Sequence, residues 1–131
     1  MAIYSVTRLR LRSAGFLPAF FLHTARSFWQ ARGAEGNLGV KVRKTVGLAF
    51  WTVTAWRDEA AGRAFRNSGA HLEAMRKLPE WCDEASFGRW EGAPGKLPDW
   101  DEAAAKLRES GRITPVKFPS EAQKTGRLNV E

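Results

Sequence analysis

The 131-residue sequence contains a single cysteine, Cys82, and only two histidines, His23 and His71. One cysteine excludes a disulfide within the chain and fits a reducing compartment, so we expect a cytoplasmic protein. Cys and His do not occur with metal-ligand spacing, and the sequence has neither a nucleophile elbow nor a phosphate-binding glycine loop. The enzyme classes that depend on those motifs are therefore excluded.

Long apolar runs are also missing. A membrane-spanning helix needs roughly 18–20 consecutive apolar residues, and no stretch of the chain approaches that length. The apolar segment GFLPAFFL (15–22) follows three arginines, as in a signal peptide, but it is short and Pro18 divides it. We expect neither a membrane span nor secretion.

Positive charge is abundant and unevenly distributed. The net charge is +7, and residues 1–46 hold eight Lys and Arg against one acid, Glu35, so this part alone accounts for 8 − 1 = +7. Such a half can bind nucleic acid or an anionic ligand, or it can be the solvated edge of strands. Because its strands lack the aromatic pattern of RNA-binding sheets, nucleic-acid binding is not expected.

The pattern of apolar residues predicts a ferredoxin-like βαββαβ domain over residues 1–92, an α+β fold with a four-stranded antiparallel sheet. Strands are predicted over 3–12, 40–46, 48–57 and 84–91. One helix is predicted over 15–31, and a second begins at Asp58, pauses at Ser68-Gly69 and ends before Pro79. Residues 93–131 then form a linker, a short helix from Asp99 to Gly111, and a tail over the surface or a neighbour.

The predicted strand 48–57 is apolar on both faces, with Phe50 and Trp56 on one and Trp51 and Val53 on the other. A strand of this kind needs cover on both sides. The predicted helices cover one face and leave too little chain for the other, which favours a homodimer.

His71 is the candidate for chemistry. Helical spacing places it beside Ser68 and Met75, at the edge of an apolar face that includes Phe65. A half-buried imidazole there requires a hydrogen bond or a ligand, and a structural role is the simpler alternative.

The runs FWTVTAWRDEAAGRAFRNSGAHLEAM (50–75) and WCDEASFGRW (81–90) resemble the dimeric α+β barrel superfamily, which includes antibiotic-biosynthesis-type and haem-degrading monooxygenases. The SGAH element, Ser68 to His71, is similar to that of spheroidene monooxygenase, and this similarity implies His71 as a catalytic residue and an axial ligand of a haem iron. The haem degraders match less well, because Phe65, Met75 and Ser5 or Thr7 replace their tryptophan, histidine and asparagine.

The resemblance implies a monooxygenase-like enzyme that oxidises a small hydrophobic or aromatic substrate, with haem as one cofactor it suggests. A non-catalytic dimer that binds a hydrophobic ligand, or has a structural role, is the alternative. Arg8 either projects into the barrel toward a ligand carboxylate or faces solvent. The residues expected at a ligand are Trp29, Trp51, Trp56, Phe65, Ser68 and Arg8, together with His71.

Overall fold

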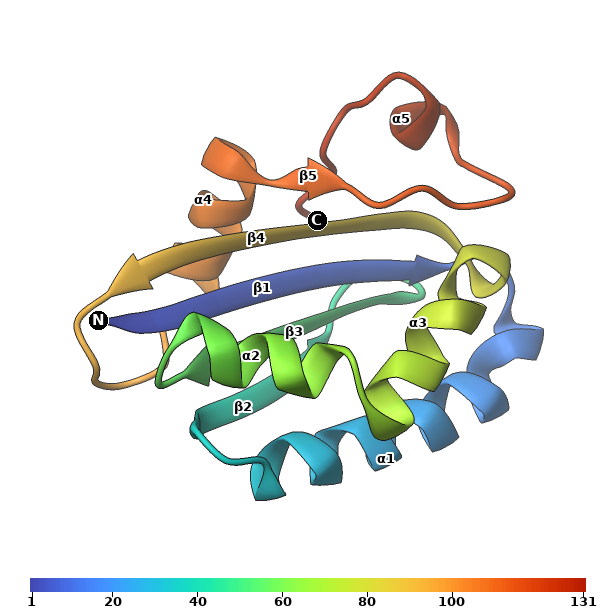
Figure 1. The fold of residues 1–131 in the computed structure, drawn as a ribbon. Coiled ribbons are helices and arrows are strands. Elements are labelled where there is room, and N and C mark those ends of the chain that lie inside the picture. Colours follow the sequence, from blue (N-terminus) through green and yellow to red (C-terminus); the bar gives the residue numbers. More distant parts are fainter.

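The computed structural model describes residues 1–131 and contains a five-stranded antiparallel sheet with the strand order β2-β3-β1-β4-β5 (Figure 1). The strands are β1 (Ala2–Leu11), β2 (Asn37–Lys44), β3 (Ala49–Trp56), β4 (Cys82–Gly92) and β5 (Arg112–Ile113). The helices are α1 (Leu17–Gly33), preceded by a 3₁₀ turn (Ala14–Phe16), then α2 (Glu59–Arg66), α3 (Gly69–Trp81), α4 (Trp100–Ser110) and α5 (Glu121–Lys124). The predicted α+β ferredoxin-like fold is confirmed. No helix is both long and apolar enough to cross a membrane.

The central strand, β1, keeps the predicted alternation of faces. It pairs with β3 on one side and β4 on the other, so that Ser5 lies opposite Thr54 and Arg89. Residues such as Val6 are fully buried on one face, whereas Ser5 and Thr7 on the other are only half-buried. The two faces of the sheet therefore have different environments.

The helix starts follow their predicted caps. The Asp58 carboxylate accepts a hydrogen bond from the Ala61 N–H, and that of Asp99 accepts one from Glu102. The predicted end at Pro79 is wrong, since α3 continues to Trp81. Proline lies here in the final turn, and Trp81 is buried in the core, which holds that turn in place.

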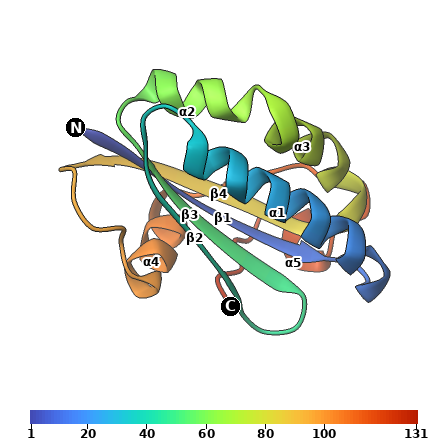
Figure 2. The same ribbon diagram turned by 90° about the horizontal axis from the view of Figure 1, so that it is seen from below.

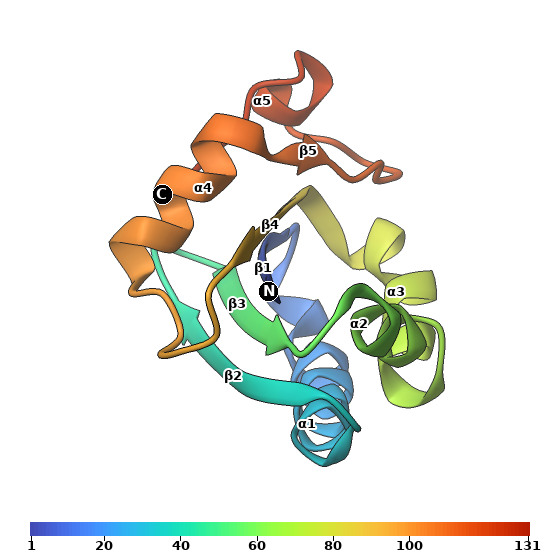
Figure 3. The same ribbon diagram turned by 60° about the vertical axis from the view of Figure 1, so that its left-hand side comes forward.

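The expectation that the chain is too short to cover the second face of the sheet is wrong. Helices α1, α2 and α3 lie on one face and α4 lies on the other (Figures 2 and 3). Ala103 and Leu107 of α4 are fully buried against Val6, Trp51 and Val53. The argument for a homodimer from an uncovered face therefore fails, and the homodimer itself stays a prediction.

The predicted tail adds a fifth strand and a short helix that fold back onto β4. Ser86 and Phe87 pair with β5, and the Thr114 N–H donates to the Ala85 carbonyl, 2.8 Å away. Gln123 in α5 donates to the Thr114 carbonyl and accepts from the Ala85 N–H. The four-stranded sheet predicted from the sequence is thus one strand short, because a two-residue strand leaves no periodic pattern.

Glu84 on β4 is the centre of a buried polar cluster on the α4 side of the sheet. Its carboxylate accepts hydrogen bonds from Arg8 at 2.8 Å, Ser120 at 2.7 Å and Asn129 at 3.2 Å, and it also pairs with Arg10 at 3.1 Å. Both predictions for Arg8 are wrong. Its side chain faces neither a ligand nor solvent, because Glu84 neutralises it within the protein and only 1% of the residue is exposed.

Candidate functional site

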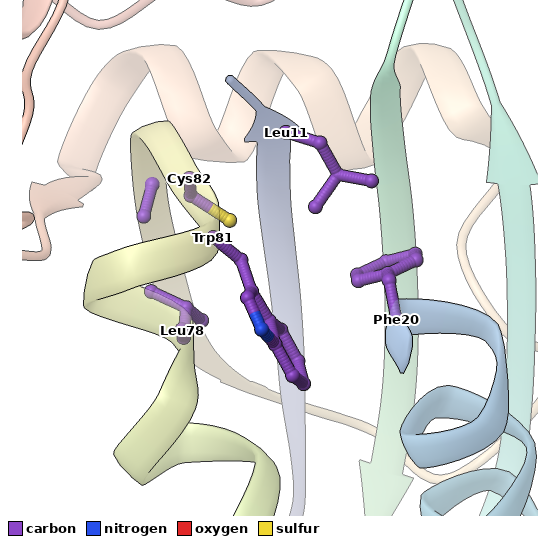
Figure 4. Close-up of a cluster of buried hydrophobic side chains, with 6 residues drawn as sticks. Leu11, Phe20, Leu78, Trp81 and Cys82 are labelled. Atoms are coloured by element: carbon purple, nitrogen blue, oxygen red, sulfur yellow. The ribbon is translucent and has the colours of Figure 1, made fainter. Parts of the chain in front are cut away.

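A cavity of about 280 Å³ lies between the sheet and helices α1, α2 and α3. One end is closed by a cluster of buried side chains in which Phe20 of α1 and Trp81 and Leu78 at the end of α3 converge near β1 (Figure 4). The walls come mainly from apolar and aromatic side chains, namely Phe28, Val40, Val42, Trp56, Phe65, Met75 and Phe87. This composition suits a ligand with an apolar body.

The floor of the cavity carries hydroxyl groups. Ser5 and Thr7 of β1 lie directly opposite Thr54 and Thr52 of β3, and all four line the cavity. Ser27 of α1 faces the same space, and its buried hydroxyl has no hydrogen-bond partner in the protein. A buried hydroxyl without a hydrogen-bond partner costs free energy, so the Ser27 hydroxyl is available to bind a polar atom of a ligand.

His71 lies in the first turn of α3 and lines the cavity. Its Nδ1 is 3.4 Å from the Arg66 carbonyl oxygen, and its ring packs 4.5 Å from the Phe65 ring, measured between centroids. Because a carbonyl only accepts, Nδ1 carries the proton in this contact and Nε2 keeps its lone pair.

The electrostatic environment keeps this imidazole neutral. Burial lowers the pKa of His71, the hydrogen bond to the Arg66 carbonyl opposes that shift, and the positive charge of Arg66 adds to it. The pKa therefore lies below its ordinary value, and near neutral pH Nε2 is available to accept a proton.

Gln30 of α1 forms hydrogen bonds with the backbone groups at the break between α2 and α3, just before His71. The Gln30 amide donates to the Ser68 carbonyl at 2.9 Å, and its oxygen accepts from the His71 N–H at 2.9 Å. Gly69 has a φ of +59°, and an added Cβ would lie 3.1 Å from the Gln30 amide. The small residue at the break thus lets Gln30 fix the position of His71, a role that the sequence reading did not assign.

The ligand residues predicted from the sequence divide into two groups. Trp56, Phe65 and His71 line the cavity. Trp29 is on the outer side of α1 with 65% exposure, and Trp51 is fully buried on the α4 side of the sheet, where its indole N–H donates to Thr45. Ser68 instead donates to the Ala64 carbonyl at the helix break, and Arg8 is on the far face with Glu84.

Sequence reasoning missed the hydroxyl floor, although its signal was present. Ser5 and Thr7, like Thr52 and Thr54, recur with a period of two on strands that were correctly predicted. The second histidine, His23, is outside the cavity, buried beside the Trp81 ring at 5.2 Å. Nowhere do three His, Cys, Asp or Glu side chains come together to hold a metal ion.

Comparisons with known proteins agree with this architecture. The antibiotic biosynthesis monooxygenase family matches residues 18–77, a little under half of the chain. No curated protein matches the sequence significantly.

Solved structures match the fold over most of their length. The structure of Rv0793 from Mycobacterium tuberculosis has a TM-score of 0.64 at 13% identity and covers 72% of this chain and 98% of its own. A putative antibiotic biosynthesis monooxygenase from Nitrosomonas europaea has a TM-score of 0.62 at 14% identity, with 70% and 89% covered. A mutant form of SnoaB, a cofactor-independent oxygenase from Streptomyces nogalater, gives 0.58 at 18% identity, with 75% and 98% covered.

At these identities the structural likeness establishes the fold alone. The resemblance to the dimeric α+β barrel superfamily is confirmed: residues 18–77 match the antibiotic biosynthesis monooxygenase family, and the sheet with α1 to α3 has the fold of these solved structures.

Proposed function

We propose that the cavity is the active site of a monooxygenase-like enzyme that oxidises a small hydrophobic or aromatic substrate, with His71 as general base. The proposal depends above all on His71, which lines the cavity as a neutral imidazole. Its Nδ1 contacts the Arg66 carbonyl oxygen, and its Nε2 is left without a hydrogen-bond partner. The family match and the fold support an oxygenase, and SnoaB is described as cofactor-independent.

Haem fits this site poorly. The Phe65 ring packs against the His71 imidazole, 4.5 Å between centroids, and leaves a flat macrocycle little room beside that ring. The reaction proposed here therefore involves no haem. His71 as an iron ligand stays a prediction, and a Soret shift on titration with haemin would support it.

The chemistry proposed here needs no external reductant. His71 Nε2 removes a proton from a ring methylene, and the resulting carbanion transfers electrons to O₂ and forms a C–O bond. The peroxide takes a proton back from His71. Cleavage of the second C–H bond and of the O–O bond then leaves a ketone and releases water, so that R₂CH₂ + O₂ gives R₂C=O + H₂O.

The hydroxyl floor supports the same chemistry. A carbanion next to a carbonyl carries its charge on oxygen, and hydroxyl donors such as Thr7 and Thr52 can stabilise that oxyanion in a cavity with apolar walls.

Oxygen uptake with anthrone, a tricyclic compound with an acidic methylene, tests the proposal. General base catalysis contributes roughly 10²–10⁴-fold, so His71→Ala should reduce the rate by at least about 10²-fold, and His23→Gln should leave it unchanged. The wild-type rate should fall as the pH drops through the pKa of His71, below its ordinary 6.5, because protonation removes the base. Full activity of His71→Ala would refute the role of His71.

Anthrone binding without oxygen uptake would instead favour the alternative, a non-catalytic protein that binds hydrophobic ligands. A homodimer and a cytoplasmic location also remain predictions. Light scattering decides the first, since a mass near that of the 14.6 kDa chain would exclude the dimer.

A further inference from the structure

Two arginines line the cavity on the side where α2 and α3 face β4. Arg66 ends α2 and Arg89 lies on β4, and both contribute to the lining. In Figure 3, β4 and β5 lie above α2 and α3. Arg112 of β5 adds a third positive charge nearby, because its charge and that of Arg66 both act on Arg89.

The carboxylate whose charge acts on Arg89 is that of Glu59, and it is already engaged. Glu59 pairs with Arg66 at 3.1 Å and with Arg63 at 3.8 Å. Arg89 has no ion pair, and its guanidinium lies over the Phe87 ring, 5.1 Å from the centroid. Partial burial and the charges of Arg66 and Arg112 lower the pKa of Arg89, against the opposing effect of Glu59. The residue is exposed, so its guanidinium is accessible at the rim of the cavity and has no carboxylate of the protein as its partner.

This arrangement differs from that of the two arginines on β1. Arg8 and Arg10 on β1 have their carboxylates, Glu84 and Asp83, within 2.9 Å. Arg89 stands opposite Ser5 in the register, so its side chain projects from the same face as the hydroxyl floor. A guanidinium is suited to bidentate binding of a carboxylate, and a site beside apolar walls strengthens such a contact.

We propose that the cavity binds an amphipathic ligand with an apolar ring system and one anionic group, a carboxylate or a sulfonate, held by Arg89 with Arg66. The inference rests on the proposed function, in that it takes the cavity as the substrate site, and it adds the substrate class: aromatic acids rather than neutral hydrocarbons. The ring system contacts Phe65, Phe87 and Met75, and the anionic group lies at the β4 side.

Two fluorescent probes that differ in one anionic group test this inference on the full chain. The probes are 1-anilinonaphthalene-8-sulfonate and its neutral analogue N-phenyl-1-naphthylamine. A hydrogen bond to a charged group contributes about 1.5–3 kcal/mol, which corresponds to at least about tenfold in Kd. Arg89→Gln should therefore weaken binding of the sulfonate by at least about tenfold and leave binding of the neutral probe within about twofold.

Two further variants make the result specific. Arg108→Gln removes an exposed arginine of α4, on the opposite face of the sheet, and should change neither affinity. Ala74→Trp fills the cavity and should weaken both probes. Sulfonate binding that survives Ala74→Trp would place the probe outside the cavity and overturn the proposal.

The outcomes separate this inference from the proposed function. Equal loss of both probes in Arg89→Gln, or no loss of either, would overturn the anion site while the cavity remained a ligand site. Failure of the wild-type protein to bind either probe would refute the cavity as a ligand site and the proposed function with it.

Discussion

Replacing Glu84 by glutamine should destabilise the protein far more than a surface substitution of the same kind. The change keeps the shape of the side chain but removes the charge that neutralises Arg8, and the exposed fractions of the two residues are only 4% and 1%. Arg8 Nη2 already has no hydrogen-bond partner, so its guanidinium depends on this carboxylate. Removing one partner of a buried ion pair costs about 3–5 kcal/mol.

Urea unfolding followed by tryptophan fluorescence measures this loss. The matched control is Glu121→Gln on α5, whose side chain is 86% exposed and pairs only with Lys124. An exposed pair of that kind contributes about 0–1 kcal/mol. A loss below about 1 kcal/mol for Glu84→Gln would refute the reasoning, since Arg8 would then be neutralised by other means.

The same pair predicts a pH dependence. Burial by itself would raise the pKa of Glu84, but the hydrogen bonds from Arg8 and Ser120 and the charges of Arg10 and Arg8 outweigh it, and the pKa is lowered. A carboxylate with a lowered pKa in the folded state stabilises the protein above its unfolded pKa, and this contribution is lost as the pH falls through the folded value. Wild-type stability should thus decrease on acidification below the ordinary Glu range, and Glu84→Gln should flatten that decrease.

Two other predictions concern the α4 side of the sheet and the single thiol. Leu107→Ala should reduce the free energy of unfolding by about 2–5 kcal/mol, because it opens a cavity beside Val6, Trp51 and Val53 that the surrounding side chains fill only in part. A loss below about 1 kcal/mol in urea unfolding would show that the packing of α4 on the sheet contributes little to stability. Burial, with the charge of Asp83, raises the pKa of the Cys82 thiol to about 12. A thiol reagent such as 5,5′-dithiobis(2-nitrobenzoate) should therefore react with Cys82 only when the protein unfolds. Rapid labelling of the native protein at pH 8 would contradict the buried position of this thiol.

Local patterns predicted much of the fold. The alternation in β1 correctly assigned its two faces, and Asp58 and Asp99 marked the starts of α2 and α4. These signals depend on residues a few positions apart, which is why a single sequence suffices. The end of α3 was misplaced because the tertiary contacts of Trp81 hold a final turn that Pro79 by itself disfavours.

The site was harder to predict, because it depends on which face of each element packs. Trp29, Trp51 and Trp56 are the same residue type, yet the first is exposed, the second is buried under α4 and only the third lines the cavity. Arg8 was misplaced because its partner, Glu84, is 76 residues away in the sequence. Neither the periodicity nor the spacing of residues along the chain specifies such a long-range pair.

The position of α4 has a consequence for the order in which the protein can fold during synthesis. The four long strands leave the ribosome before α4, and until then Val6, Trp51 and Val53 form an uncovered apolar layer on the four-stranded sheet. At roughly 5–20 residues per second this layer waits on the order of seconds for its cover. The nascent sheet is therefore the form most exposed to aggregation and to capture by chaperones.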